Sequence, residues 1–156
     1  MHFDNTYGAH LGSDCLQQFG NPLKVYNDTI YFSVTDENDG CLKCFDEFGN
    51  ITQLSEHNGG IESFDICEKG IYFVGTRAQK LQEIYTLKDM KETQITNFNT
   101  AFMETCTFSP VEKIVFHNDG IRHEAFVIKP VDYDPNKKYP GVLEIHGGPK
   151  GTFGPC

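Results

Sequence analysis

The stretch of this chain best suited to chemistry contains His146, Gly147, Gly148 and Pro149. The two glycines carry no Cβ atom, so the backbone can adopt positive φ angles and bring its N–H groups close to a ligand. N–H groups placed in this way stabilise the negative charge that develops on a carbonyl oxygen during acyl transfer. The four residues therefore predict an oxyanion-binding loop. A plain turn after a strand is the alternative interpretation.

The residues just before this loop have the composition of a buried strand. Pro140 is compatible with the first position of a strand, and Val142, Leu143 and Ile145 suit a pleated, buried surface. We expect these residues to form a strand that ends directly at the loop. A strand followed by a His-Gly-Gly loop is typical of the α/β-hydrolases, in which a backbone N–H of this loop contributes to the oxyanion hole.

The other groups that such catalysis needs are missing from the sequence. An α/β-hydrolase requires a Gly-x-Ser-x-Gly motif, an acid and a histidine, in that chain order. No Gly-x-Ser-x-Gly motif occurs in the 156 residues, and the chain ends at Cys156, seven residues after Pro149. We therefore expect the nucleophile, the acid and the base to lie beyond Cys156. We predict no catalytic residue, and no hydrolysis by this chain alone.

The histidines that are present do not fill the missing roles. We expect His117 and His123 on the surface, on either side of a hairpin turn. We expect His146 to brace the loop in which it lies, because no Gly-x-Ser-x-Gly serine is available as its partner.

The cysteines do not indicate a metal site. They are spread over the chain, at positions 15, 41, 44, 67, 106 and 156. Only Cys41 and Cys44 are close in sequence, and no second pair completes the ligand set of a zinc site. We expect free thiols, some of them buried in strands, and neither a metal nor a cofactor.

Charge and hydrophobicity limit the partners and the compartment. The sequence has 13 Lys and Arg against 22 Asp and Glu, a net charge of −9, and such an acidic chain lacks the basic face that nucleic-acid phosphates require. The N-terminus resembles no signal peptide, because it has an early acid and no apolar segment. No apolar run approaches the roughly 20 residues that span a bilayer. We expect a cytoplasmic protein that binds neither nucleic acid nor membrane.

The middle of the chain contains a repeat. An Ile-Tyr-Phe triplet at 30–32 recurs at 71–73, and Thr-Gln-Leu at 52–54 recurs as Thr-Gln-Ile at 93–95, both with an offset of 41 residues. Each copy also has a second short strand between its triplets. A period in the low forties, built from short strands between Asp, Gly and Asn turns, is typical of β-propeller blades. Two similar hairpins in a sandwich are the alternative.

The pattern changes after the repeat. We interpret residues 76–87 as a loop plus a strand, and residues 100–109 as an apolar connector that ends at Pro110. Two strands follow, the first around residues 113–116 and the second at 121–128. Asp119 and Gly120 lie between them, and Asp-Gly is a strong hairpin signal.

Taken in order, these pieces resemble the prolyl oligopeptidase family of serine peptidases, and most closely its acylaminoacyl-peptidase-like branch. The matching residues are Asn118-Asp119-Gly120, Val127-Ile128-Lys129-Pro130, Lys137-Lys138-Tyr139-Pro140 and His146-Gly147-Gly148-Pro149. The resemblance implies a β-propeller joined to an α/β-hydrolase domain, with the active site between them. It also implies attack by a serine on the carbonyl group of short peptides.

We therefore expect a mainly β chain: the last blades of a β-propeller, residues 1–110, followed by the first strands of an α/β-hydrolase domain, residues 111–156. The chain would be a fragment of a serine peptidase that acts on short peptides, truncated before the nucleophile. Open strand edges and unburied apolar faces predict self-association. The alternatives are a propeller-type binding module without chemistry and an esterase of the wider α/β-hydrolase group.

Overall fold

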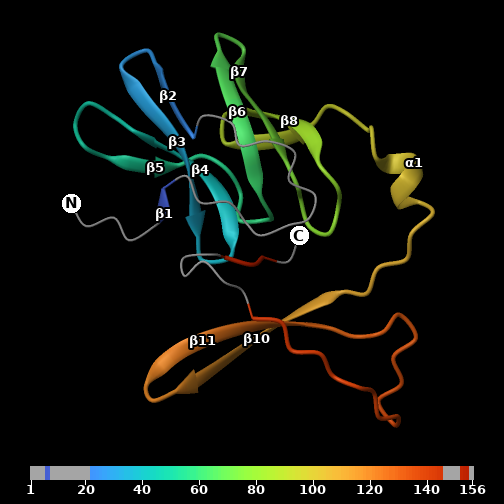
Figure 1. Cartoon of the computed structure of the whole chain (residues 1–156). Helices are drawn as coiled ribbons and strands as arrows, with labels where there is room; N and C mark the ends of the chain where they lie inside the picture. The colour runs from blue at the N-terminus through green and yellow to red at the C-terminus, as the bar shows by residue number, and fades with distance from the viewer. Residues whose placement is uncertain (1–5, 8–21, 146–151, 155–156) are drawn as a thin grey trace.

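The computed structural model describes residues 6–7, 22–145 and 152–154 (Figure 1). In the described residues, two antiparallel sheets are followed by a hairpin, with one helical turn between them. The first sheet contains β1 (Thr6–Tyr7), β2 (Leu23–Tyr26), β3 (Thr29–Asp36), β4 (Asp39–Phe45) and β5 (Ile51–Gln53). The second contains β6 (Ile61–Cys67), β7 (Gly70–Gly75), β8 (Glu83–Lys88) and β9 (Lys91–Gln94). The helix α1 (Thr100–Met103) precedes the hairpin of β10 (Val111–Asn118) and β11 (Ile121–Ile128).

Each of the two sheets contains an equivalent unit of four strands. In each, consecutive strands pair antiparallel with their neighbours, from β2 to β5 in the first sheet and from β6 to β9 in the second. The first Ile-Tyr-Phe triplet lies in β3 and the second in β7, while the Thr-Gln pairs lie in β5 and β9. The 41-residue sequence repeat therefore coincides with a repeat of the strand pattern. The first sheet has an addition, because β1 pairs with the end of β3 beyond β2.

The main core lies where the two sheets pack together. It contains Leu42 from the first sheet and six residues of the second, with Tyr31, Leu54 and Ile66 packed against it. The six are Ile61, Phe64, Ile71, Phe73, Tyr85 and Leu87. A smaller cluster of Phe32, Val34 and Cys41 is buried on the other face of the first sheet. The alternation of side chains along β3 explains both clusters, since successive residues point to opposite faces of a sheet.

Gly40 allows the sheets to approach closely where β4 begins. A Cβ atom at this position would lie 2.8 Å from the backbone nitrogen of Ile61, a distance that real Cβ atoms essentially never show. The backbone N–H of Gly40 instead donates to the carbonyl oxygen of Gly59, at 2.7 Å. This contact brings the loop between β5 and β6 next to the turn between β3 and β4.

The predicted hairpin is confirmed. Asn118 pairs with Ile121, and the two turn residues Asp119 and Gly120 have φ angles of 51° and 77°. Positive φ at both central residues suits a two-residue hairpin turn, and Asp-Gly adopts it readily. Residues 76–82 form a loop before β8, as predicted. The segment from 95 to 110, called the connector below, leads from β9 through α1 to the hairpin.

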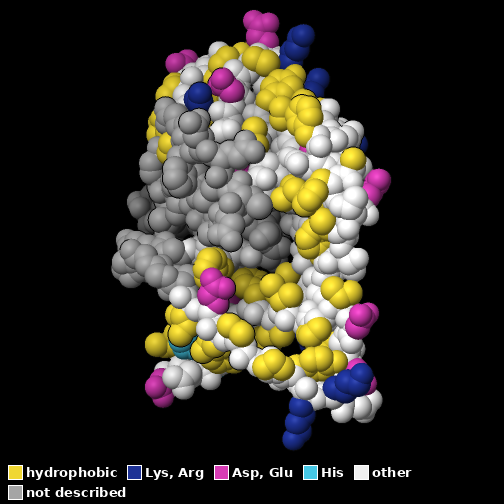
Figure 2. Space-filling view, turned by 45° about the vertical axis from the view of Figure 1, so that its right-hand side comes forward, with side chains coloured by type: hydrophobic (Ala, Val, Ile, Leu, Met, Phe, Trp, Pro, Cys, Tyr) yellow, Lys and Arg dark blue, Asp and Glu magenta, His cyan; other side chains and the backbone are white. Residues whose placement is uncertain are grey.

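The predicted buried strand before the loop is wrong for this structure. Residues 141–145 form no strand, and Val142, Leu143 and Ile145 are 95%, 85% and 80% exposed. A central strand needs a hydrogen-bonded neighbour and a covered face, and no strand of the described residues pairs with this segment. Figure 2 shows hydrophobic side chains gathered on the lower part of the molecule, where the hairpin and this segment lie.

The described residues contain no helix long and apolar enough to cross a membrane.

Candidate functional site

The predicted oxyanion loop lies outside the described residues. The oxyanion-binding role of His146, Gly147, Gly148 and Pro149 therefore stays a prediction. Cys156, beyond which the sequence predicts the nucleophile, acid and base, also lies outside the described residues, so the structure does not test that prediction.

The two hairpin histidines differ in exposure. His117 is exposed, as expected. His123 is instead half-buried, because it stacks on the ring of Phe116 with the two ring centroids 5.2 Å apart. Neither residue contributes to the polar site described next.

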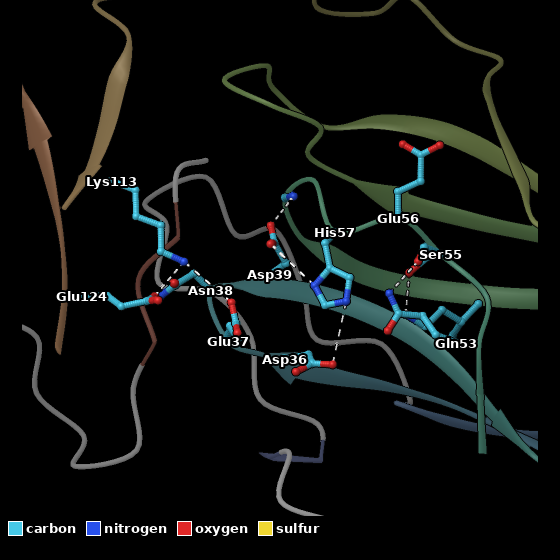
Figure 3. Close-up of polar contacts among 12 residues, drawn as sticks. Asp36, Glu37, Asn38, Asp39, Gln53, Ser55, Glu56, His57, Lys113 and Glu124 are labelled. Atoms are coloured by element: carbon cyan, nitrogen blue, oxygen red, sulfur yellow. Dashed lines mark hydrogen bonds and ion pairs between the residues drawn. The ribbon is translucent and has the colours of Figure 1, made fainter. Parts of the chain in front are cut away.

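The structure brings polar side chains together where the first sheet meets the hairpin (Figure 3). The turn between β3 and β4 supplies Asp36, Glu37, Asn38 and Asp39, with a φ of 53° at Glu37. The Asn38 side-chain amide donates to the carbonyl oxygen of Phe153, at 3.3 Å. This junction is the candidate site, since segments far apart in the sequence meet there.

His57 lies between two of these carboxylates. Its Nε2 is 3.9 Å from Asp36 Oδ2, and its Nδ1 is 3.9 Å from Asp39 Oδ2. Both distances exceed a hydrogen bond, so the ring is hydrogen-bonded to neither carboxylate. Both acids have nearer partners: the Lys43 ammonium lies 2.6 Å from Asp36, and the backbone N–H of Gly59 donates to Asp39 at 2.7 Å.

The hairpin faces this turn with a charged group of its own. Lys113 Nζ lies 2.9 Å from Glu124 Oε2 and 3.7 Å from Glu37 Oε2 (Figure 3). Arg122 also pairs with Glu124. Burial alone would raise the pKa of Glu124, but the hydrogen bond and charge of Lys113, together with Arg122, hold it below its usual value. Lys113 therefore links the hairpin to the first sheet.

This junction lacks the groups for nucleophilic catalysis within the described residues. Ser55 Oγ accepts a hydrogen bond from the backbone N–H of Leu42 at 2.8 Å, and no contact joins Ser55 to His57 in that part of the chain. A serine nucleophile needs a histidine within hydrogen-bond reach. The described residues of the junction can hold charge and orient neighbouring segments, and they include no serine hydrogen-bonded to a histidine.

A second polar cluster lies inside the second sheet. The guanidinium of Arg77 binds Glu92 through two hydrogen bonds, of 2.7 and 3.0 Å, and both side chains are 7% exposed. It also donates to the carbonyl oxygens of Gly60 and Thr76 and lies 4.7 Å from the ring centroid of Phe73. Both charged groups are buried and hydrogen-bonded within the protein, so we interpret this ion pair as one that stabilises the fold and not as a binding site. Sequence reasoning missed it, because no local motif marks partners that lie on separate segments.

A third buried charge is Glu83, at the start of β8. Its residue is 4% exposed, and its carboxylate accepts hydrogen bonds from Thr96, Phe98 and Asn99. Burial alone would raise the pKa of Glu83, but these hydrogen bonds lower it below its usual value. A pocket of about 440 Å³ lies beside it, between the segment that leads into β8 and the first part of the connector.

The cysteines have no arrangement for metal or redox chemistry in the described part. Cys41, Cys44, Cys67 and Cys106 are free thiols there, and no cluster of His, Cys, Asp and Glu in the described ranges could hold a metal ion. Burial, followed by the charges of Asp36 and Asp39, raises the pKa of Cys41 to about 12. A thiol with such a pKa stays protonated and unreactive at neutral pH.

Comparisons with known proteins indicate the class. No protein-family model matches the chain. Over 98 residues it is 29% identical to the uncharacterized peptidase YuxL of Bacillus subtilis (strain 168), a match that covers 60% of this chain and 15% of the relative. The fold is similar to the acylaminoacyl peptidase of Pyrococcus horikoshii, with a TM-score of 0.74 and 25% identity, over 85% of this chain and 21% of that one.

A further structure, of an acylaminoacyl peptidase in complex with Z-Gly-Gly-Phe-chloromethyl ketone, matches the fold with a TM-score of 0.77 at 23% identity, over 90% of this chain and 22% of that one. The chain thus spans between 15% and 22% of the length of these three proteins. Its sequence relative is a peptidase, and its structural neighbours are acylaminoacyl peptidases. The resemblance to the prolyl oligopeptidase family of peptidases, which the motifs indicate, is confirmed.

Proposed function

We propose that this chain is part of a serine-type peptidase of the acylaminoacyl-peptidase-like type, acting on short peptides. In this proposal the two four-stranded units are blades of a β-propeller, and the hairpin with the following segment begins an α/β-hydrolase domain. One observation carries the proposal: the fold, with its two equivalent units and hairpin, is similar to an acylaminoacyl peptidase over 85% of the chain, with a TM-score of 0.74. The peptide-derived inhibitor bound to the second neighbour supports peptides as the substrate class.

The exposed apolar segment before the loop supports the same arrangement. Val142, Leu143 and Ile145 have the composition of a central strand but lack neighbouring strands in the described residues. Further strands of a hydrolase sheet would cover them and would hold Gly147 and Gly148 next to the substrate carbonyl. Each N–H donor of an oxyanion hole contributes about 3 to 4 kcal/mol of transition-state stabilisation. The nucleophile, acid and histidine would come from other parts of the longer polypeptide.

The test uses that longer polypeptide and a substitution in the loop. Replacing Gly147 with valine adds a branched side chain where the backbone must approach the substrate closely, and we expect kcat to fall by a factor of about 100 or more. Glu47→Val, in the exposed turn between β4 and β5 and outside the proposed hydrolase sheet, is the control. Turnover of an acylated peptide is the measurement. Equal turnover in wild type and Gly147→Val would overturn the oxyanion role.

A binding module without chemistry is the competing function, and the same assay separates the two. The two four-stranded units suit a binding module equally well. A longer polypeptide that binds acylated peptides without cleaving them would establish this function. We expect cleavage instead, and no cleavage by the 156-residue chain alone.

Self-association of the isolated chain remains a prediction. Large apolar side chains are exposed on the hairpin, including Ile114, Val115, Phe116 and Ile121, and contiguous exposed apolar surface favours association. We expect a dimer or larger species at micromolar concentration. Light scattering coupled to size exclusion measures the mass, and a clean monomer would contradict the prediction.

A further inference from the structure

Glu83 attaches the beginning of the connector to the second sheet. One carboxylate oxygen accepts from the backbone N–H of Phe98, at 3.0 Å, and from the Thr96 hydroxyl, while the other accepts from the backbone N–H of Asn99, at 2.7 Å. The Asn99 side chain donates to the carbonyl oxygen of Gln82, at 2.6 Å. One buried carboxylate thus fixes the backbone at the point where the chain leaves β9 and enters α1.

The connector is attached again at its end. The side-chain amide of Gln79 donates to the carbonyl oxygen of Ser109, at 2.8 Å, two residues before β10 begins. Gln79 and Glu83 both belong to the segment that leads from β7 into β8. Both ends of the connector are therefore held by one short stretch of the second sheet, and the 440 Å³ pocket lies between that stretch and α1.

From these contacts we infer that the connector, because it is held at both ends, fixes the position of the hairpin relative to the two sheets. We infer that Glu83 is the positioning residue for the first of these ends. Within the described residues, the hairpin has few other attachments to the sheets. The ion pair between Lys113 and Glu37 spans 3.7 Å, and its side chains are 38% and 62% exposed. Exposed pairs of this kind contribute little, whereas a buried carboxylate with several donors is a strong attachment.

The inference concerns the chain itself, so it holds or fails independently of the proposed peptidase function. When the Glu83 contacts open, Ile95 and Thr96 stay hydrogen-bonded to Ile84, but the backbone at residues 98 and 99 loses its acceptor. The connector is then held less firmly at its start, and the hairpin can move away from the first sheet. In the closed state, which the structure shows, Lys113 remains within reach of Glu37. We expect this opening to be local, because no residue of the connector belongs to the main core that contains Phe73.

The test measures where the hairpin lies. A carbodiimide that joins an amine to a carboxylate without a spacer will link Lys113 to Glu37 and also to Glu124, its partner within the hairpin. Mass spectrometry measures the ratio of the Lys113–Glu37 product to the Lys113–Glu124 product. The second product forms within the hairpin and serves as the internal standard, so the ratio reports how close the hairpin lies to the first sheet. We expect Glu83→Gln to lower the ratio at least fivefold, because a neutral amide holds the three donors poorly. Glu104→Gln, an exposed acid on the same pocket, is the control and should leave the ratio unchanged.

Hydrogen exchange gives the second readout. In Glu83→Gln we expect the amides of Phe98 and Asn99 to exchange at least tenfold faster, while amides of β7 keep the wild-type rate. An unchanged cross-link ratio, or faster exchange spread evenly over the second sheet, would overturn the inference. Should Glu83→Gln fail to fold, Gln79→Ala gives the second test, because it removes the other attachment, the hydrogen bond to the carbonyl oxygen of Ser109, and should also lower the cross-link ratio.

Discussion

Two apolar stretches of similar composition have opposite environments in this molecule. The Ile-Tyr-Phe triplet of β7 lies between β6 and β8, and its Phe73 is 1% exposed. The segment from 141 to 145 is equally rich in strand-forming residues, yet it has no paired neighbour among the described strands, and Leu143 is 85% exposed. Composition alone therefore does not make a buried strand. Neighbouring strands must be present to satisfy its backbone and to cover its side chains.

The largest expected effect comes from removing a side chain in the buried stretch. Phe73→Ala empties a site between Tyr85, whose ring stacks on it at 5.2 Å, and the Arg77 guanidinium. We expect a loss of about 3 to 5 kcal/mol in the free energy of unfolding. Leu143→Ala is the matched substitution in the exposed segment and should change stability by less than about 0.5 kcal/mol. Urea denaturation measures both. Similar losses in the two variants would contradict the difference in burial.

The buried ion pair of the second sheet gives the next effect. Arg77→Met leaves the Glu92 carboxylate buried with one backbone partner, the N–H of Glu56 at 2.9 Å. We expect a loss of about 3 kcal/mol, because an uncompensated buried charge is strongly unfavourable. The control breaks an exposed pair on the hairpin side, where Lys129 lies 2.6 Å from Glu112. Lys129→Met should cost clearly less stability than Arg77→Met, and an equal cost for both pairs would show that burial is not the deciding factor.

A smaller effect concerns the stability of the folded chain at low pH. Hydrogen bonds hold the pKa of Glu83 below its usual value in the folded chain, despite its burial. A carboxyl whose folded pKa is lowered contributes stability above its unfolded pKa of about 4.3, and this stability is lost as pH falls through the folded value. We therefore expect the melting temperature to drop between about pH 5 and pH 3, and to drop less in Glu83→Gln. Parallel curves for the two proteins would rule out Glu83 as a source of the acid sensitivity.

Local signals explain what the sequence could predict. The repeat was visible because strand triplets recur at a fixed offset, and the hairpin because Asp119 and Gly120 suit its turn. The buried strand at 142–145 was predicted from the same kind of signal and is wrong here, since burial depends on neighbours that the local sequence does not specify. The His57 contacts and the Arg77–Glu92 pair could not be predicted, because they join residues of separate strands and loops through tertiary packing.

The predicted candidate site and the observed one differ for a related reason. The oxyanion prediction rests on residues 146–149, which the structure does not describe. The junction between the β3–β4 turn and the hairpin has no sequence motif, because Lys113 and Glu37 meet only after both elements have folded. A motif of consecutive residues can be read from a sequence, whereas a charged contact between two distant segments cannot.

Covalent labelling tests the central claim most directly. The longer polypeptide is treated with a serine-directed fluorophosphonate, and the modified residue is located by mass spectrometry, with the 156-residue chain treated in parallel. We predict one labelled serine within a Gly-x-Ser-x-Gly motif beyond Cys156, protection of that serine by an acylated peptide, and no labelling of the short chain. No labelled serine in an otherwise folded longer polypeptide, or a label on a serine within residues 1–156, would contradict the proposed serine peptidase.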